Sequence, residues 1–464
     1  MKRILIVASV LALLGAAPAG AQLDMSNYVA LGDSATAGLV SGGLVDCYQH
    51  LSYPAMLADQ AGSPAFEMPL ISAPGVPSVL QLVSLAGGVP VIEPVGDFMD
   101  SFPYNVEYPL PYNNLAVPTA TLYDMLFQIG DIQNLAVGNF ENIMFDLILR
   151  IPQVPNPATG EPMDFTAVVQ AVALQPSFVT VWIGMNDILG GVVSGTPISG
   201  ITMTPVETFG LLYPQAVGAL ATQTTADIVL FTIPDLSELA FATTIPPYLD
   251  IPGLGVVPIM GSNGPLTANS RVTLLASELL ALGYGVPLPG FPPLPDDFDL
   301  TTGAPGYILR PDEIALLKSH TAALNGVIRA TAAQFGLPVF EAGAVSDRAT
   351  SGEGYTYGGV NLNGDFLTGG LISFDGIHPN QLGHALLANE LIGFLNDTYR
   401  AGIEPLNLNE ILFDNPCIPL PAPAGIDGAS VTFSPEARDT LLEMFMPDLP
   451  TQGPVENTST TAAD

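Results

Sequence analysis

The chain has 464 residues, of which 44 are acidic and only 10 are basic, so its formal charge is −34 at pH 7. This balance argues against binding to nucleic acid or to an anionic membrane surface, because both need basic patches. Only 12% of the residues are charged, and 48% are hydrophobic. Many of the apolar residues fall in Pro/Gly-rich stretches, which suggests a surface made for apolar ligands.

The first 21 residues read as a secretory signal peptide. Lys2 and Arg3 form a basic start, residues 4–14 are apolar and too few to span a bilayer, and the small residues 19–21 precede Gln22. Cleavage before Gln22 leaves 8 basic residues against 44 acidic ones, a formal charge of −36. We therefore expect a secreted, periplasmic or cell-surface protein.

Four short apolar runs predict strands that are covered on both faces, as in a parallel sheet. They are Tyr28 to Leu31, Phe178 to Ile183, Ile228 to Ile233 and, more weakly, Pro338 to Phe340.

Helical patterns lie between and after these runs. One is predicted to begin at Pro311 and to stop at Gly336, and another follows His378 with Pro379 as its first residue. Alternating strands and helices indicate an α/β protein whose chemistry lies at the carboxyl ends of the strands.

The candidate site residues extend from Ser34 to His378, so a single domain, predicted at 22–416, must include them. Two long insertions, at about 63–112 and 237–306, are apolar and are expected to border the active site. The Pro-rich tail, 417–464, is expected to be partly disordered, with one short helix around 435–445. The only cysteines, Cys47 and Cys417, are predicted to form a disulfide in an exported protein.

Ser34 follows the first predicted strand in the run Gly32-Asp33-Ser34. Small neighbours would let a substrate carbonyl approach this serine and would leave backbone N–H groups free to bind an oxyanion. On this block alone, a turn in which Asp33 and Ser34 merely cap a helix explains the residues equally well.

Asp375 and His378 lie three residues apart in a turn before a helix. This spacing lets the carboxylate reach one imidazole nitrogen while the other nitrogen faces a serine, as a general base requires. An Asp cap with an incidental histidine is the alternative. The other three histidines, His50, His320 and His384, sit in contexts that favour structural roles.

With a third block at Gly184-Met185-Asn186-Asp187, the chain resembles the SGNH (GDSL-type) hydrolase family of esterases and lipases. The resemblance implies a flavodoxin-like three-layer α/β/α fold with a parallel sheet and long loop insertions. It implies the triad Ser34, His378 and Asp375, with an oxyanion hole formed by the Ser34 and Thr119 backbones and the Asn186 side chain. Thr119 stands where the family has a glycine.

The resemblance implies metal-free, cofactor-free hydrolysis of a small-molecule or lipid ester through an acyl-enzyme. The acidic runs around Asp296 and Asp365 are interpreted as surface turns, since neither has the ligand spacing of a calcium loop. The alternatives are a carbohydrate (acetyl) esterase or acyltransferase of the same fold and, from another class, an inactive cell-surface binding module. The sequence does not indicate an oligomeric state.

Overall fold

The computed structural model describes residues 23–64, 66–84, 89–109, 111–414 and 431–446. The strands are β1 (Tyr28–Gly32), β2 (Leu80–Ser84), β3 (Val91–Pro94), β4 (Gln153–Pro155), β5 (Pro162–Asp164), β6 (Phe178–Trp182), β7 (Asp227–Phe231), β8 (Tyr248–Ile251), β9 (Gly255–Pro258), β10 (Met260–Gly261), β11 (Gly264–Pro265), β12 (Arg271–Val272), β13 (Ile308–Leu309), β14 (Val339–Phe340), β15 (Tyr355–Tyr357), β16 (Val360–Leu362) and β17 (Thr432–Phe433).

The α-helices are α1 (Ser34–Ala37), α2 (Asp46–Gln49), α3 (Tyr53–Gln60), α4 (Leu122–Phe127), α5 (Gln133–Ala136), α6 (Ile143–Ile148), α7 (Ala167–Ala173), α8 (Asn186–Val193), α9 (Val206–Gln223), α10 (Ala240–Thr243), α11 (Ser277–Ala281), α12 (Pro311–Phe335), α13 (Ala342–Thr350), α14 (Gln381–Tyr399), α15 (Leu408–Asp414) and α16 (Pro435–Phe445). Single 3₁₀ turns are η2 (Phe98–Asp100), η3 (Leu236–Glu238) and η4 (Leu274–Ala276).

The central sheet is parallel and contains all four predicted strands, in the order β1-β6-β7-β14. Residues 113–117 run along the free edge of β1, where Ala30 pairs with Asn114 in parallel and Leu115 N–H donates to the Ala30 carbonyl at 2.9 Å. With this edge segment second in the chain, the spatial order becomes 2-1-3-4-5, the order of flavodoxin-like sheets. The predicted α/β class is therefore confirmed.

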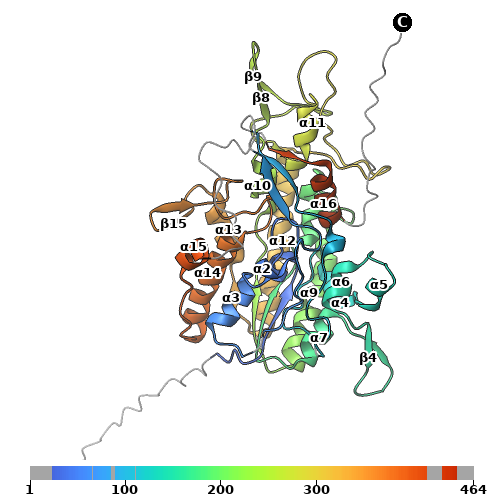
Figure 1. The fold of residues 1–464 in the computed structure, drawn as a ribbon, viewed down its shortest axis with the longest axis vertical. Coiled ribbons are helices and arrows are strands. Elements are labelled where there is room, and N and C mark those ends of the chain that lie inside the picture. The colour runs from blue at the N-terminus through green and yellow to red at the C-terminus, as the bar shows by residue number, and fades with distance from the viewer. Residues whose placement is uncertain (1–22, 65, 85–88, 110, 415–430, 447–464) are drawn as a thin grey trace, which may run out of the picture.

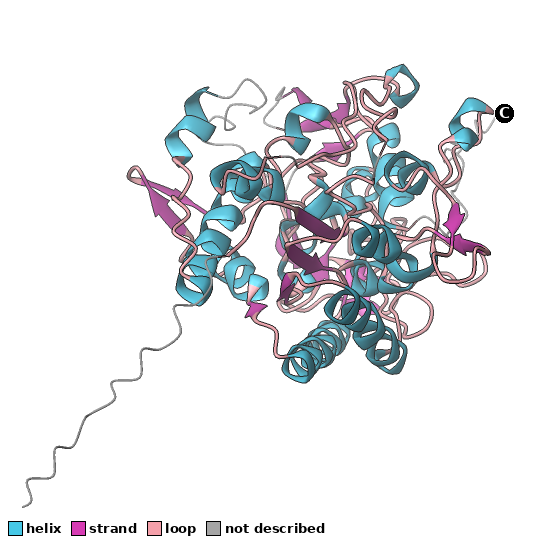
Figure 2. Cartoon of the chain, turned by 90° about the horizontal axis from the view of Figure 1, so that it is seen from below, coloured by secondary structure: helices cyan, strands magenta, loops and turns pink. Residues whose placement is uncertain are grey.

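Successive residues of the buried strands face two different helical layers, because strand side chains alternate between faces. Val29 and Val179 belong to the cluster formed with α7, α9 and α12, whereas Ala30 and Phe178 belong to the cluster formed with α3 and α14. The three-layer α/β/α arrangement is visible in Figure 1 and, with the strands enclosed by helices, in Figure 2.

The two predicted helices are present, with one shift at a boundary. α12 begins at Pro311 and ends where Gly336 adopts a positive φ of 69°, as predicted. α14, in contrast, begins at Gln381 rather than Pro379. The reason is Asn380, whose side-chain oxygen accepts the backbone N–H groups of the first turn and so fixes the helix start.

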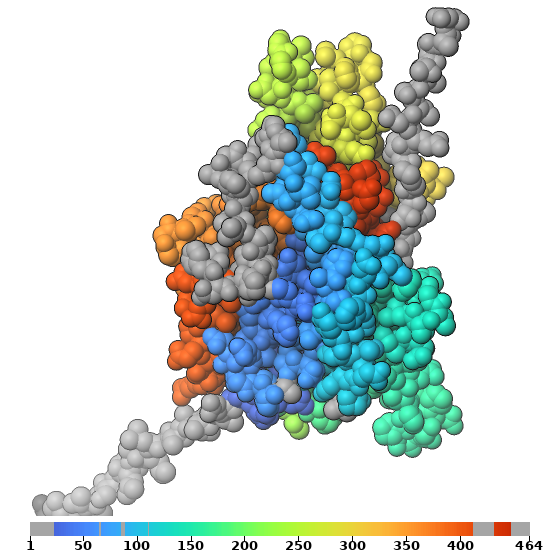
Figure 3. All heavy atoms as spheres, in the orientation of Figure 1, coloured from blue at the N-terminus to red at the C-terminus, as the bar shows by residue number. Residues whose placement is uncertain are grey.

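The insertion at 237–306 contributes largely to the main core rather than to a separate surface. Its buried residues include Phe241, Ile259, Leu274 and Leu294, all in one cluster with the central domain. The antiparallel hairpin β8–β9 projects from this region, as Figures 1 and 3 show. In the insertion at 63–112, β3 pairs with β2 on one side and with β17 from the C-terminal segment on the other.

The predicted C-terminal helix at 435–445 is present as α16. The predicted signal peptide and Cys417 lie outside the described residues, so cleavage before Gln22 and the Cys47–Cys417 disulfide stay predictions. Within the described part of the chain, no helix has both the length and the apolar character needed to cross a membrane.

Candidate active site

Ser34 is the first residue of α1 and is separated from the end of β1 by Asp33 alone, so it lies at the carboxyl edge of the sheet. Asp33 caps this short helix by accepting the Ala35 N–H at 3.3 Å. A side chain at Gly32 would place its Cβ 2.5 Å from the Trp182 carbonyl oxygen. Only glycine therefore lets β1 end this close to β6, and the serine is positioned by that contact.

The structure brings Ser34, His378 and Asp375 into one hydrogen-bonded chain. Ser34 Oγ lies 2.7 Å from His378 Nε2, and His378 Nδ1 lies 2.9 Å from Asp375 Oδ2. The three residues are 6%, 3% and 0% exposed, respectively. These are the distances at which a base can take a serine proton while an acid orients the base.

Asp375 is held by backbone donors as well as by the histidine. Its Oδ1 accepts the N–H groups of Ile377 and His378 at 2.8 and 2.9 Å, and its Oδ2 accepts that of Gly42 at 2.9 Å. Burial alone would raise the pKa of Asp375, but the charge of His378 and these hydrogen bonds outweigh it and lower the pKa below its usual range. The Asp375 carboxylate is therefore ionised at pH values near 7.

The remaining histidines have other surroundings. His384 is fully buried in α14, and burial, with the charge of His378, lowers its pKa to about 3. His320 contacts the Thr204 carbonyl oxygen through Nε2 at 2.9 Å, and His50 ends α2. Structural roles, as predicted from the sequence, fit these positions.

Asn186 begins α8 and lines the same pocket as Ser34. Its side-chain nitrogen donates one hydrogen bond to the Ala120 carbonyl at 3.0 Å. An amide nitrogen carries two N–H bonds, so this contact orients the side chain and uses only one of them, while the role of Asn186 in an oxyanion hole stays a prediction.

Thr119 adjoins Ala120, the residue that Asn186 holds, and its backbone φ is +71°. A β-branched residue is strained in this left-handed region, whereas glycine is not. The backbone conformation at this position therefore favours glycine, which is the residue that the SGNH (GDSL-type) family has there. Thr119 is not among the residues that line the pocket, so its place in an oxyanion hole stays a prediction.

Two buried acids lie under the site. Burial raises the pKa of Asp33 to about 8 despite the Ala35 hydrogen bond, and the charge of Asp187 adds to the rise. Burial also raises the pKa of Asp187 to about 6, although Asp187 Oδ2 accepts the Leu122 N–H at 2.9 Å. That bond, with the one from Asn186 to Ala120, fixes the segment that contains Thr119 above the strand ends.

A pocket opens directly onto Ser34 and His378 and holds about 840 Å³ of empty space, including its open mouth. Apart from the Trp182 indole, the polar side chains on it are those of Ser34, Asn186, Ser346 and His378. The rest of the wall is apolar, and its members come chiefly from α13, the segment 371–379, α14 and the residues after β6 and β7: Ala35, Met185, Leu189, Pro234, Leu236, Leu239, Ala342, Val345, Ala349, Leu371, Ile372, Ile377, Pro379, Gly383, Leu386 and Leu387.

The sequence predicts that both insertions border the active site, and for the lining of this pocket that prediction is wrong except at one residue. Among the lining residues, Leu239 alone comes from 237–306, and none comes from 63–112. Part of the reason is that buried apolar residues of the second insertion, such as Ile259, Leu274 and Leu294, pack in the main core. Others, such as Val256 and Leu300, are exposed but do not line this pocket. Residues of α13, α14 and the segment 371–379 supply much of the apolar wall instead.

No group of His, Cys, Asp or Glu within the described residues is arranged to hold a metal ion. The interpretation of the run around Asp296 as a surface turn is wrong for Asp296 itself, which is 2% exposed and forms a salt bridge with Arg310. Asp365 lies in an exposed turn, where its N–H donates to the Asn363 side chain.

A family model described as "GDSL-like Lipase/Acylhydrolase" matches residues 28–391. The chain belongs to the GDSL-like lipase/acylhydrolase family. The resemblance found from the sequence blocks is thereby confirmed, and it places the protein among hydrolases. None of the curated proteins matches the sequence at a significant level.

Two solved structures are similar to this GDSL-like chain. One is an α/β-hydrolase enzyme from the metagenome of Lake Arreo, Spain, with 13% identity and a TM-score of 0.33 over 79% of this chain and 94% of the other. The second is phospholipase A1 from Streptomyces albidoflavus, with 13% identity and a TM-score of 0.30 over 80% of this chain and 98% of the other.

Two residues beside the GDSL-type site were missed by sequence reasoning. Gly42 holds Asp375 through its backbone N–H, which no side-chain motif reveals. Phe445 stacks on the His378 ring from the C-terminal segment, beyond the residues that the family model matches. An apolar residue in a short amphipathic helix carries no signal of such a contact.

Proposed function

We propose that this protein is an exported serine hydrolase that cleaves carboxylic esters with apolar acyl chains through an acyl-enzyme. The observation that carries the proposal is the hydrogen-bonded chain of Ser34, His378 and Asp375 opening onto a pocket with an apolar wall. Export rests on the signal-like residues 1–21.

In the acylation step, Ser34 Oγ attacks the ester carbonyl carbon while His378 Nε2 accepts the serine proton. The Asn186 amide and the backbone N–H of Ser34 donate hydrogen bonds to the carbonyl oxygen and stabilise the negative charge that develops there. The Ser34 N–H has no acceptor within α1, because it belongs to the first turn of that helix. Asp375 stabilises the imidazolium that forms. When the ester C–O bond breaks, His378 returns the proton to the departing alcohol.

In the deacylation step, His378 removes a proton from water, and the resulting hydroxyl attacks the acyl-serine carbonyl. The Ser34 ester bond then breaks, the proton returns to Ser34 Oγ, and the carboxylic acid leaves. The overall reaction converts an ester and water into a carboxylic acid and an alcohol. His378 carries out each proton transfer in both steps.

The pocket favours an apolar acyl group over a sugar ester. Val345 and Ala349 from α13 face the same space as Leu386 and Leu387 from α14, and no acidic or basic side chain lines it except His378. Each methylene of an acyl chain that is buried there contributes about 0.8 kcal/mol at best. Sugar rings, in contrast, would leave several hydroxyl groups without partners on such a wall.

The test is a series of p-nitrophenyl esters from acetyl to decanoyl, assayed with the wild-type protein and with Ser34→Ala. We expect kcat/KM to rise from acetyl toward medium-length acyl chains, and Ser34→Ala to be inactive on all of them. Activity confined to acetyl esters would overturn the acyl-pocket assignment, and activity that survives in Ser34→Ala would overturn the mechanism.

A further inference from the structure

We propose that the C-terminal segment, residues 431–446, positions the general base: Phe445 packs against the His378 imidazole in an offset stack and holds it in line with Ser34. This inference rests on the proposed function. It adds a positioning residue from outside the part of the chain that the family model matches.

The contact is a stack of two rings. The centroids of Phe445 and His378 are 5.8 Å apart with an interplanar angle of 26°. The hydrogen bonds to Ser34 and Asp375 run in the plane of the imidazole, so they do little to resist tilting of the ring out of that plane. The near-parallel Phe445 ring, in offset contact with the imidazole, limits that tilting.

This support matters most during the reaction. Once Ser34 Oγ has bonded to the acyl carbon, the direct hydrogen bond between Oγ and Nε2 is weakened, and Asp375 alone holds the imidazole through polar contacts. Phe445 does not line the substrate pocket. It therefore covers a part of His378 that the substrate leaves free and can stay in place throughout turnover.

The segment that carries Phe445 is anchored at its start. β17 runs parallel to β3, with the Thr432 N–H donating to the Pro90 carbonyl at 2.8 Å and the Ser434 N–H to that of Ile92 at 2.9 Å. Figure 3 shows the red C-terminal segment against the light-blue β2–β3 region. The α16 helix is further tied by a salt bridge at 2.8 Å between Arg438 and Glu278 of α11.

The apolar face of α16 also contacts the loops that hold the acid. A Cβ at Gly42, the donor to Asp375, would lie 3.8 Å from Leu441 Cδ2. Phe445 contacts Phe241 edge to face, with centroids 6.4 Å apart, and the Phe241 N–H donates to the Gly376 carbonyl at 2.8 Å. The segment thus packs against the loop that contains Gly42 and next to the loop that contains Gly376, both of which lie around His378.

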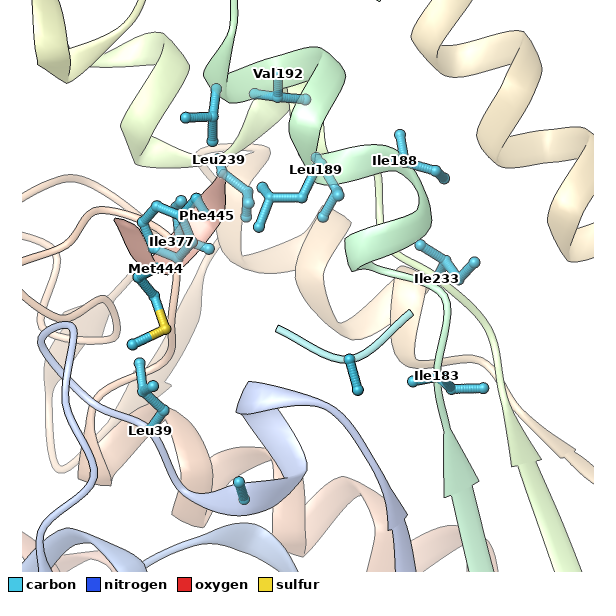
Figure 4. Packing of buried hydrophobic residues seen from close by; sticks show 14 of the residues in the cluster. Leu39, Ile183, Ile188, Leu189, Val192, Ile233, Leu239, Ile377, Met444 and Phe445 are labelled. Atoms are coloured by element: carbon cyan, nitrogen blue, oxygen red, sulfur yellow. The ribbon is translucent and has the colours of Figure 1, made fainter. Parts of the chain in front are cut away.

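Figure 4 shows the same packing from close by. The Met444 side chain points toward Leu39, and Phe445 lies next to Ile377, the residue before His378. All four belong to one buried cluster, and Phe445 itself is 7% exposed. The end of α16 is therefore seated in the core around the site rather than resting on the surface.

The experiment compares Phe445→Ala with a matched control in the same segment, Phe433→Ala. Phe433 is also buried, 2% exposed against 7% for Phe445, but its ring stacks on Phe366, with centroids 6.4 Å apart, rather than on His378. Both substitutions remove a buried phenyl ring and both destabilise the fold. A third variant, Phe445→Leu, keeps most of the apolar volume but loses the flat face, and it covers the case in which Phe445→Ala does not fold.

Activity is measured at a temperature at which circular dichroism shows all variants to be folded. We expect Phe445→Ala to lower kcat about tenfold or more with little change in KM, since small displacements of a base are costly. The kcat of Phe445→Leu should lie between those of the wild type and Phe445→Ala, and Phe433→Ala should keep nearly the wild-type kcat. Equal kcat losses in Phe445→Ala and Phe433→Ala, or an unchanged kcat in Phe445→Ala, would overturn the inference.

The rate of labelling by a fluorophosphonate separates this inference from the proposed function. If the wild type is not labelled at Ser34, the proposed function fails. If it is labelled and Phe445→Ala reacts at the wild-type rate, only the positioning role of Phe445 fails.

Discussion

Gly42 donates its backbone N–H to Asp375 Oδ2 at 2.9 Å, although the two residues are 333 positions apart in the chain. Beside this bond, the Ser41 N–H donates to Ser373 Oγ at 3.0 Å and the Phe374 N–H to Ser41 Oγ at 3.3 Å. The loop after the serine helix and the loop that carries the acid and the base are therefore one hydrogen-bonded unit. Displacing either loop should displace the other.

The first prediction concerns Asp375. Asp375→Asn removes the charge that stabilises the imidazolium and favours the wrong imidazole tautomer, so we expect kcat to fall by about 10³- to 10⁴-fold. An amide nitrogen in place of Oδ2 cannot accept the Gly42 N–H, so circular dichroism is used to check that the variant is folded. Steady-state kinetics measure the fall in kcat. Asp164→Asn on the exposed β4–β5 hairpin makes the same chemical change away from the site and should be neutral. A loss of less than tenfold in Asp375→Asn would contradict the assigned role.

A second prediction concerns pH and stability. The raised pKa of Asp33, about 8 against an ordinary 3.8, means that the folded protein keeps this proton longer than the unfolded chain does. Stability conferred by the proton is present below pH 4 and is lost as pH rises toward 8, by at most about 1.4 kcal/mol per pH unit. Asp33→Asn cannot ionise, so its stability relative to the wild type should increase from pH 5 to pH 8.

Urea unfolding at several pH values measures that difference, and taking mutant minus wild type cancels the titration of groups that do not interact with Asp33. Asp187 does interact with Asp33, so a change in its titration is part of the measured difference. Asp164→Asn again serves as the control and should show no such trend. A flat difference between Asp33→Asn and the wild type from pH 5 to pH 8 would show that Asp33 is ionised throughout the range.

The third prediction concerns the strained backbone at Thr119. Both Thr119→Gly and Thr119→Ala remove the side-chain hydroxyl, but only glycine accepts the φ of +71° without strain. We expect Thr119→Gly to be more stable than Thr119→Ala by about 1 kcal/mol in thermal or urea unfolding. Both variants keep the backbone N–H and should stay active. The reverse order of stability would mean that the turn relaxes to another conformation.

A fourth prediction addresses Asn186. Asn186→Ala removes a side-chain donor to the oxyanion, and we expect kcat to fall by about 10²- to 10³-fold with a smaller change in KM. The contact with the Ala120 carbonyl is also lost, so unfolding is measured in parallel. A variant that unfolds earlier but retains its kcat would assign Asn186 to structure alone.

The last of these predictions places the acyl chain between α13 and α14. Val345→Phe adds volume to the pocket wall, so kcat/KM for an octanoyl ester should drop about tenfold while that for the acetyl ester changes little. Leu211→Phe, at a position on α9 that is 70% exposed, is the control. Equal losses on both esters would place the chain elsewhere.

The parts of the molecule that local patterns specify were predictable. Buried strands such as 178–182 are continuous apolar runs, and the ends of α12 are set by Pro311 and Gly336. The local sequence is therefore enough to predict these strands and these helix ends. Asp375 and His378 were identifiable because they lie three residues apart in a turn before a helix. Ser34 is far from them in the chain, and it was identifiable only because the sequence blocks together resemble one family.

Other features depend on contacts between distant segments and left no local trace. The apolar residues of 237–306 suggested a pocket rim, but several of them fill the core, and others, such as Val256 and Leu300, are exposed away from the pocket. Which of these occurs depends on how distant segments of the chain pack. The pairing of β17 with β3 and the stack of Phe445 on His378 join segments that no sequence pattern links. The edge segment at 113–117 has too few strand contacts to be recognised as a strand.

The central claim, that Ser34 is the nucleophile activated by His378, is tested most directly by mapping the site of fluorophosphonate labelling with peptide mass spectrometry. The account predicts a single modified residue, Ser34, in the wild type, with no labelling of Ser34→Ala and very slow labelling of His378→Ala. Modification of another serine, or labelling of His378→Ala at the wild-type rate, would contradict it.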